Sequence, residues 1–257
     1  MIKLFLSDID GCLCQPYEAY DVDGFGRIRE WIGKAEEDSL IPRFGLCSGR
    51  SYAYVEAIAQ LLDLRAPALF ESGGGRFDLQ DARIRWNPEL TPEVETELDA
   101  VRTFFLRSVV GADAGFSLDY GKRAQTGVVN ASQREVERFL PMVRDFVTRE
   151  LPDLRVYETH ASIDVVPKRM TKLQAIRWVA DQEELTLEEI AFIGDSRGDV
   201  EAISAVGVGF SPQNGSFAAR EAADVVTRGA VIQGVLEAFE WCVERNRAER
   251  RHLAERQ

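Results

Sequence analysis

The sequence predicts an α/β protein with a doubly wound parallel sheet and a smaller α+β module inserted into it. Apolar runs and segments of helical spacing alternate from residue 1 to residue 81, in the order strand, helix, strand, helix, strand that builds such a sheet. The alternation returns from residue 167 onward, whereas residues 82–166 mix hairpin-like strands with two helices. We therefore expect a core domain at 1–81 and 167–257, with an inserted domain at 82–166.

The first core segment supplies three of the expected strands. IKLFLSD at 2–8 is an apolar run that ends in an aspartate, which is typical of a central parallel strand. Residues 25–35 have helical spacing, and PRFGLCSGR at 42–50 is expected to form a strand and a turn. A helix at 51–62 and a strand at 67–72 complete the segment. We expect function at the edge where the first strand delivers its aspartate.

The same signals predict the strands and helices of the insertion and of the second core segment. The insertion is expected to hold short strands and two helices, at 83–86, 92–107, 115–120, 125–131, 133–149, 155–159 and 162–167. The second core segment is expected to hold strands and helices at 188–196, 199–206, 206–210, 224–227 and 231–254.

The composition argues against nucleic-acid and membrane partners. The formal net charge is -12 at pH 7, and nucleic-acid binding depends on neutralising phosphates with Lys and Arg. No stretch approaches the ~18 consecutive apolar residues of a membrane span, and the opening residues lack the basic head and cleavage site of a signal peptide. An acidic chain can still bind a small anion where local cations or a metal are supplied.

The cysteines indicate the compartment. They are Cys12, Cys14, Cys47 and Cys242, and they lack paired C-x-x-C spacing. Because only His160 and His252 are present besides, a zinc cluster would have few ligands. We expect reduced thiols and a cytoplasmic protein, while the sequence leaves the oligomeric state open.

Two pairs of aspartates follow apolar strands at the same expected edge of the sheet. Alternation along the first strand end brings Asp8 and Asp10 near one site, while Ile9 points elsewhere. Asp195 and Asp199 follow another apolar strand. Paired acids also serve as loop caps, but four carboxylates at one edge are costly without a cation and suit Mg²⁺.

Phosphate-binding candidates lie at two helix starts. Ser48, Gly49 and Arg50 follow the second strand, where a hydroxyl and backbone N–H groups can hold phosphate oxygens. An ordinary serine N-cap explains the same residues equally simply. Lys172 stands one residue after a threonine that can cap a helix, and its interest comes only from the other motifs.

The stretch Glu71, Ser72 and Gly73 has two interpretations. It is either a loop that faces a substrate or a hinge that needs flexible glycines. Lys122 and Arg123 in the insertion are either contacts for an anionic substrate or solvated surface cations, and we favour the latter.

Taken in this order, the motifs resemble those of the haloacid dehalogenase (HAD) superfamily of phosphohydrolases. The resemblance covers both core segments, and the insertion between Ser48 and Lys172 looks like the C2-type cap of subfamily IIB. That subfamily includes Cof-type sugar phosphatases, sucrose-phosphate and mannosylglycerate-phosphate phosphatases, and archaeal phosphoglycolate phosphatases.

The resemblance implies roles for the acidic residues. Asp8 would attack a phosphate ester to form an aspartyl-phosphate, and Asp10 would act as the general acid/base. Asp8, the Asp10 backbone carbonyl, Asp195 and Asp199 would hold Mg²⁺, whose charge offsets the repulsion between a carboxylate and a phosphate.

The resemblance also implies roles for the polar residues, and it has departures. Ser48 would bind the transferring phosphoryl group, and Lys172 would neutralise the nucleophile and the phosphate. The family commonly has Thr at position 12, Asn at 72 and Asn at 198, where this chain has Cys12, Ser72 and Gly198. We expect the last change to weaken support near the metal.

The expected function is therefore Mg²⁺-dependent hydrolysis of a small phosphorylated metabolite, a sugar phosphate or a phosphorylated acid. Two alternatives remain: a phosphotransferase or phosphomutase, and a non-catalytic phospho-binding regulatory protein. An intact Asp10 and a large cap weigh against the regulatory alternative.

Overall fold

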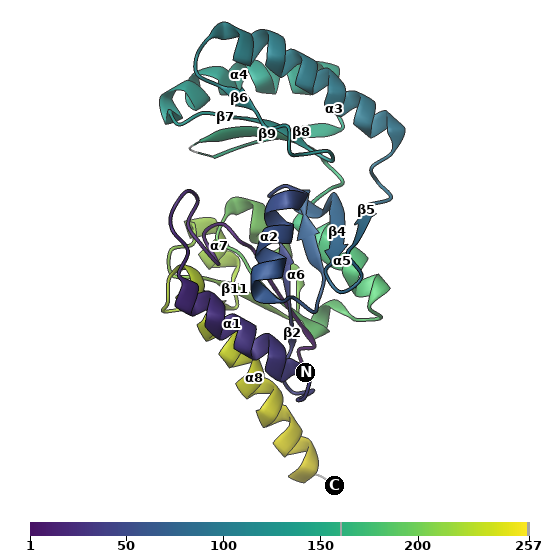
Figure 1. Ribbon diagram of the computed structural model, residues 1–257, viewed down its shortest axis with the longest axis vertical. Helices are drawn as coiled ribbons and strands as arrows, with labels where there is room; N and C mark the ends of the chain where they lie inside the picture. The colour runs from purple at the N-terminus through teal and green to yellow at the C-terminus, as the bar shows by residue number, and fades with distance from the viewer. Residues whose placement is uncertain (160, 256–257) are drawn as a thin grey trace.

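The computed structural model describes residues 1–159 and 161–255, so His160 lies outside the described part of the chain. The chain forms two sheets, of eight and four strands. The smaller sheet lies above one edge of the larger one in Figure 1.

Eight strands form the larger sheet. From one edge to the other they are β12 (Val225–Val226), β11 (Val208–Ser211), β10 (Ile190–Ile193), β1 (Leu4–Ser7), β2 (Arg43–Cys47), β3 (Ala68–Phe70), β4 (Gly75–Asp78) and β5 (Arg83–Trp86). The strands from β12 to β3 are parallel, and β4 and β5 add an antiparallel edge. The predicted parallel α/β sheet is thus confirmed.

Helices cover both faces of this sheet. On one face are α1 (Val22–Ala35), α2 (Tyr52–Leu62) and α8 (Val231–Glu255), and on the other α5 (Lys172–Gln182), α6 (Val200–Ala205) and α7 (Phe217–Ala222). Short 3-10 segments are η1 (Glu71–Gly73), η3 (Val110–Ala112), η4 (Leu187–Glu189) and η5 (Arg197–Asp199).

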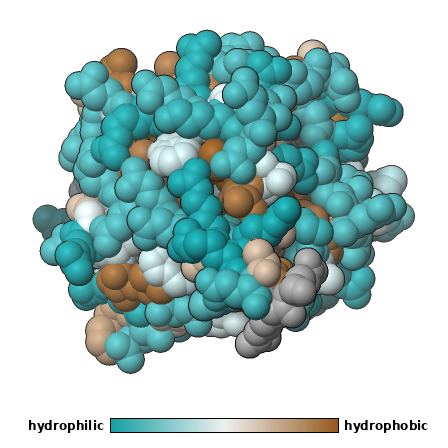
Figure 2. Space-filling model, turned by 90° about the horizontal axis from the view of Figure 1, so that it is seen from below, coloured by the Kyte–Doolittle hydropathy of each residue, from teal (hydrophilic) through white to brown (hydrophobic). Residues whose placement is uncertain are grey.

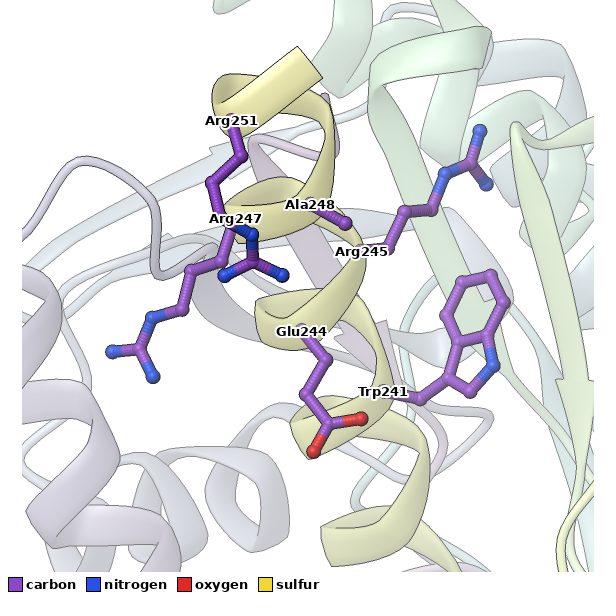
Figure 3. A pocket seen from close by; sticks show the side chains of 6 residues that line it. All are labelled: Trp241, Glu244, Arg245, Arg247, Ala248 and Arg251. Atoms are coloured by element: carbon purple, nitrogen blue, oxygen red, sulfur yellow. The ribbon is translucent and has the colours of Figure 1, made fainter. Parts of the chain in front are cut away.

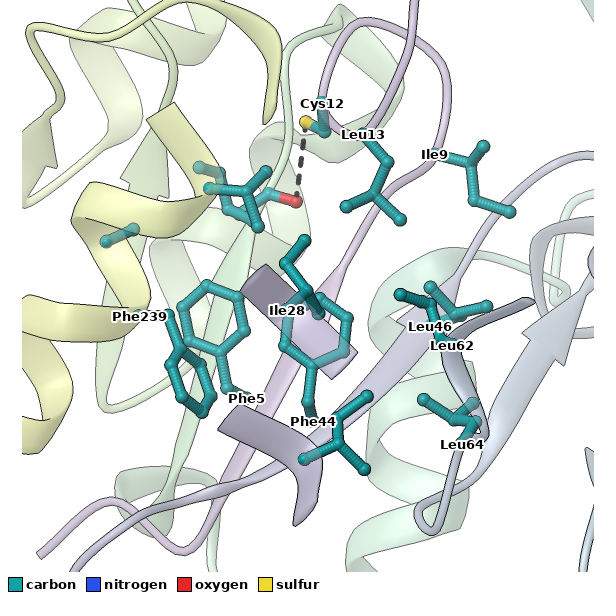
Figure 4. Packing of buried hydrophobic residues seen from close by; sticks show 14 of the residues in the cluster. Phe5, Ile9, Cys12, Leu13, Ile28, Phe44, Leu46, Leu62, Leu64 and Phe239 are labelled. Carbon is teal, nitrogen blue, oxygen red and sulfur yellow. Dashed lines mark hydrogen bonds between the residues drawn. The ribbon is translucent and has the colours of Figure 1, made fainter. Parts of the chain in front are cut away.

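Alternation along β1 builds a core on each side. Phe5 packs toward α8, with its ring centroid 5.5 Å from that of Phe44 and 5.3 Å from that of Phe239 (Figure 4). Leu4 and Leu6 pack into the cluster under α5 and α6. Because every residue of β1 is buried, the strand fixes the position of the loop that follows it.

We call the four strands β6–β9 with α3 and α4 the cap module. Its antiparallel sheet has the order β6 (Ser117–Leu118), β7 (Thr126–Val129), β9 (Ser162–Pro167) and β8 (Leu154–Glu158). Its helices are α3 (Pro92–Phe104), continued by the π-helical turn η2 (Phe105–Val109), and α4 (Gln133–Glu150). The helices cover the outer face of the sheet, and the other face is turned toward the larger sheet (Figure 1).

The edge of the larger sheet differs from the sequence-based expectation. The strand at 83–86 was expected in the insertion, but it pairs with β4 and so extends the larger sheet. The reason is β4, a strand at 75–78 that was not predicted because it directly follows a run of glycines. Gly75 lets β4 pair closely with β3, because a Cβ at this position would lie 2.1 Å from the Phe70 ring.

The surface opposite the cap module is mostly hydrophilic. Figure 2 shows apolar side chains there only in small separate groups. Among the described residues, no helix combines the length and the apolar character needed to cross a membrane.

Candidate active site

The aspartates after β1 and β10 meet at one edge of the larger sheet. β1 and β10 are parallel neighbours, with Ser7 opposite Ile193, so their following loops lie side by side. Carboxylate oxygens of Asp8, Asp195 and Asp199 all lie within 4.8 Å of one another. The structure thus brings together three of the four aspartates that were expected at this edge.

Two glycines permit this crowding. A Cβ at Gly11, which has a φ of +72°, would lie 2.2 Å from Oδ2 of Asp195. A Cβ at Gly194 would lie 2.4 Å from Cβ of Asp199. Any larger side chain at either position would push the carboxylates apart.

Lys172 supplies the cation of the cluster. Its Nζ lies 2.6 Å from Oδ2 of Asp8 and also donates to Oδ1 of Asp199. The other oxygen of Asp199 accepts from the backbone N–H and the hydroxyl of Ser196, at 2.9 and 2.6 Å. Lys172 begins α5, where Thr171 caps the helix, so the helix start fixes the ammonium group.

The cluster carries more negative charge than Lys172 offsets. Burial raises the pKa of Asp8 to about 8, against the opposing charge of Lys172, and Asp199 and Asp195 raise it further. Burial and Asp199 likewise raise the pKa of Asp195 to about 7. The pKa of Lys172 rises despite burial, because Asp199 and Asp8 favour the ammonium form. Three crowded oxygen donors of this kind fit a hard divalent cation.

Asp10 is bound to Arg50 rather than to the carboxylate cluster. The Nε of Arg50 lies 2.5 Å from Oδ2 of Asp10, and Nη2 lies 2.8 Å from Oδ1. The guanidinium also lies over the rings of Tyr54 and Tyr17, at 4.7 and 5.7 Å from their centroids. This planar group therefore joins the loop after β2 to the loop after β1.

Ser48 lies at the end of β2 and is buried. Its hydroxyl accepts a hydrogen bond from the backbone N–H of Arg50 at 3.3 Å. Its backbone carbonyl accepts one from the backbone N–H of Ser72. The carbonyl of Gly49 accepts from Nε2 of Gln125 in the cap module at 2.6 Å. The loop after β2 is thus held by both parts of the protein.

Glu71 contacts the cap module. Its Oε2 accepts from the backbone N–H groups of Arg123 and Ala124, at 2.8 and 2.6 Å. Glu71, Ser72 and Gly73 have φ values of 50°, 55° and 95°, so three successive residues are left-handed. Burial raises the pKa of Glu71 to about 7, against those backbone hydrogen bonds.

The two insertion cations already have partners. Nζ of Lys122 lies 2.8 Å from Oδ1 of Asp164, and its side chain is only 10% exposed, so the expectation of a solvated cation is wrong for this residue. Arg123 is half-exposed and pairs with Glu95 at 2.6 Å.

Sequence reasoning missed several residues that support the site. Ser196 binds Asp199, Gln125 binds Gly49, and the side-chain amide of Asn214 donates to the carbonyl of Gly11 at 2.9 Å. Single polar residues in loops carry no periodic signal, so spacing rules do not find them.

A separate surface hollow of about 600 Å³ follows α8. Figure 3 shows that its arginines project from the helix in different directions. None of its lining residues belongs to the aspartate cluster; they are Trp241, Glu244, Arg245, Arg247, Ala248 and Arg251.

Comparison with known proteins agrees with this fold. The family model for haloacid dehalogenase-like hydrolases matches residues 128–239. A phosphoglycolate phosphatase of Natronomonas pharaonis is 25% identical over 242 residues, which are 93% of this chain and 97% of that protein.

Two solved structures share the fold. A haloacid dehalogenase-like hydrolase from Bacteroides thetaiotaomicron has a TM-score of 0.71 at 21% identity, over 93% of this chain and 99% of that one. The sucrose-phosphatase of Synechocystis, solved with sucrose and phosphate, has a TM-score of 0.66 at 13% identity, over 94% and 98%.

These comparisons agree with the resemblance to haloacid dehalogenase-like hydrolases that the motifs indicate. The relatives and solved structures are consistent with the expected subfamily IIB, and the prediction of a phosphoric monoester hydrolase is confirmed at the level of enzyme class.

Proposed function

We propose that the protein is a Mg²⁺-dependent phosphatase of small phosphorylated acids, with Asp8 as the nucleophile. The observation that supports this best is the buried Lys172, which lies between Asp8 and Asp199 beside Asp195. A nucleophilic carboxylate needs such charge compensation when it meets an anionic phosphate.

The residues divide the reaction into two steps. In the first, an Asp8 oxygen bonds to phosphorus while the ester bond breaks, and Asp10 gives its proton to the departing alkoxide. In the second, Asp10 takes a proton from the water that attacks the aspartyl-phosphate, which restores Asp8 and releases phosphate. The hydroxyl of Ser48 and the Lys172 ammonium group hold the phosphoryl oxygens.

Asp8, Asp195 and Asp199 are the side chains that would hold Mg²⁺, with the Asp10 carbonyl as a further donor. When bound, the ion supplies positive charge against the phosphate and the nucleophile. The crowding of these three side chains within 4.8 Å and the raised pKa values of Asp8 and Asp195 fit such an ion.

The phosphorylated-acid class is proposed from the relatives, which are named phosphoglycolate phosphatases. Hydrolysis is preferred to phosphoryl transfer, because Asp10 serves for both half-reactions without a second acceptor. We also propose that the cap domain begins after β5 and ends with β9, and that the protein is cytoplasmic because all four cysteines are buried thiols.

The test is phosphate release from a panel of phosphoglycolate, sugar phosphates and glycosyl-glycerate phosphates, with Mg²⁺ and with EDTA. We expect Mg²⁺-dependent release, highest for a phosphorylated acid and independent of any added acceptor. Folded protein that releases no phosphate from any member of the panel contradicts the proposal.

A further inference from the structure

The strand β8 turns two side chains toward the core. Val156 packs into the apolar cluster under α3 and α4, so Arg155 and Tyr157, its neighbours in the strand, lie on the opposite face. That face is the one turned toward the larger sheet (Figure 1).

Arg155 is a constrained cation without an anion. Within the described cap strands it is the sole Lys or Arg, and over residues 1–159 and 161–255 no carboxylate lies within ion-pair distance of it. Its guanidinium lies 4.8 Å from the centroid of the Tyr157 ring, and its Nε is buried without a hydrogen-bond partner. A buried donor without a partner is costly, so this group is suited to receive an anionic oxygen.

Three other cations near the core–cap junction are already paired with carboxylates. Arg50, Lys122 and Arg123 each have a carboxylate at 2.5–2.8 Å. An incoming anion would have to displace those partners, whereas Arg155 requires no such exchange.

Arg155 also lines a cavity next to the catalytic elements, although Asp8, Lys172 and Asp199 are not among its lining residues. The cavity has a volume of about 610 Å³, and Thr171 and Glu201 are among its other lining residues. Thr171 directly precedes Lys172, and Glu201 lies two residues after Asp199. The cavity therefore connects β8 with the starts of α5 and α6.

Tyr157 lies beside Arg155 on the same face of β8. Burial raises the pKa of its hydroxyl, and the charges of Arg155, Glu201, Lys172 and Asp199 all act on it.

We propose that Arg155 is the specificity-determining residue of the cap module and that it binds a carboxylate on the alcohol part of the phosphate ester. This rests on the proposed phosphatase function. The planar guanidinium fork matches a carboxylate in two parallel hydrogen bonds, and the Tyr157 ring holds the fork in place.

The test compares two esters that differ only in this group. Ethyl phosphate has a methyl group where 2-phosphoglycolate has its carboxylate. Steady-state kcat and KM are measured for both esters with wild-type protein, Arg155→Met and Arg155→Lys. The matched control is Arg149→Met, which removes the same charge from the exposed face of α4.

We expect Arg155→Met to lower kcat/KM for 2-phosphoglycolate by about tenfold or more, mainly through KM, because a charge-assisted hydrogen bond is lost. Ethyl phosphate should change by less than about threefold, Arg155→Lys should recover part of the loss, and Arg149→Met should behave as wild type. Equal losses for both esters, or a wild-type enzyme that does not prefer 2-phosphoglycolate, would overturn the proposal.

Failure of the phosphatase function itself gives a different result. In that case wild-type protein releases phosphate from neither ester. Calorimetric binding of 2-phosphoglycolate to wild type and Arg155→Met then decides the carboxylate claim: equal affinity, or no binding to wild type, overturns it.

Discussion

Arg50 occupies both carboxylate oxygens of Asp10, through Nε at 2.5 Å and Nη2 at 2.8 Å. Bidentate pairing of this kind stabilises the ionised carboxylate. To protonate a leaving group, the Asp10 side chain must first take up a proton and free one oxygen from the guanidinium. In the proposed mechanism Arg50 therefore orients Asp10 for its role as the acid.

The role of Asp10 predicts a dependence on the leaving group. Asp10→Asn should lower kcat for ethyl phosphate by about 10²- to 10⁴-fold, because the alkoxide then leaves without a proton. p-Nitrophenolate is a much weaker base and needs no such proton. Rapid mixing of the variant with p-nitrophenyl phosphate should give a burst of one p-nitrophenol per active site, followed by slow turnover. Absence of the burst would assign Asp10 to the first step for every ester.

The two hydrogen bonds from the Arg50 guanidinium to Asp10 predict a similar but smaller dependence of kcat on the leaving group. Arg50→Lys keeps the charge but loses the two parallel hydrogen bonds. We expect kcat for ethyl phosphate to fall about tenfold and kcat for p-nitrophenyl phosphate to fall less. Arg27→Lys, at an exposed ion pair on α1, is the control. Equal losses for both esters would indicate that Arg50 binds the phosphate rather than orients Asp10.

The buried Lys172 predicts a stability that depends on metal. Lys172→Met leaves Asp8 and Asp199 without their cation, and loss of one member of a buried pair costs about 3–5 kcal/mol. Urea unfolding in EDTA should show this loss in the free energy of unfolding. Mg²⁺ should restore part of it, because an ion that binds only the folded state stabilises it. A variant as stable as wild type in EDTA would contradict this account of the charge balance.

Glu71 predicts a pH dependence of stability. Its pKa is raised from 4.5 to about 7 in the folded protein, so the folded state binds this proton more tightly than the unfolded state does. The contribution is therefore present in full below pH 4.5 and is lost as the pH rises through about 7. Glu71→Gln keeps the acceptor for the two N–H groups of the cap module and removes the titration.

Relative to wild type, Glu71→Gln should gain stability as the pH rises, on the order of 3 kcal/mol by pH 8. Urea unfolding of both proteins between pH 4.5 and 8 measures the difference. A difference that stays constant across this range would mean that Glu71 does not titrate within it.

The sequence was sufficient to predict the parallel part of the sheet and the meeting of Asp8, Asp195 and Asp199. Apolar runs and helical spacing are local signals, and β1 and β10 end where those runs end. Parallel strands then bring Asp8 and Asp195 to one edge by geometry alone. The approach of Lys172 was consistent with its motif but not deducible from spacing.

Contacts between the core and the cap module were beyond sequence reasoning. The partners of Glu71 are backbone N–H groups of Arg123 and Ala124, more than fifty residues away. No side-chain type signals such an acceptor. The pairing of Asp10 with Arg50 was missed for the same reason, since either residue alone suggests a contact to phosphate or metal.

The environment of Asp199 revises one expectation. Gly198 was expected to weaken the support of this carboxylate. Ser196 instead donates twice to Oδ2 of Asp199, through its backbone N–H and its hydroxyl. The loop after β10 therefore holds the carboxylate with a residue on the other side of Gly198.

The most direct test of the account is to locate the phosphoryl group during turnover. Acid quenching of the enzyme with substrate and Mg²⁺, followed by peptide mass spectrometry, should find one phosphoryl group on the peptide that carries Asp8. Asp8→Asn should show neither this adduct nor phosphate release. A phosphoryl group on another residue, or undiminished turnover by Asp8→Asn, would contradict the assignment of Asp8 as the nucleophile.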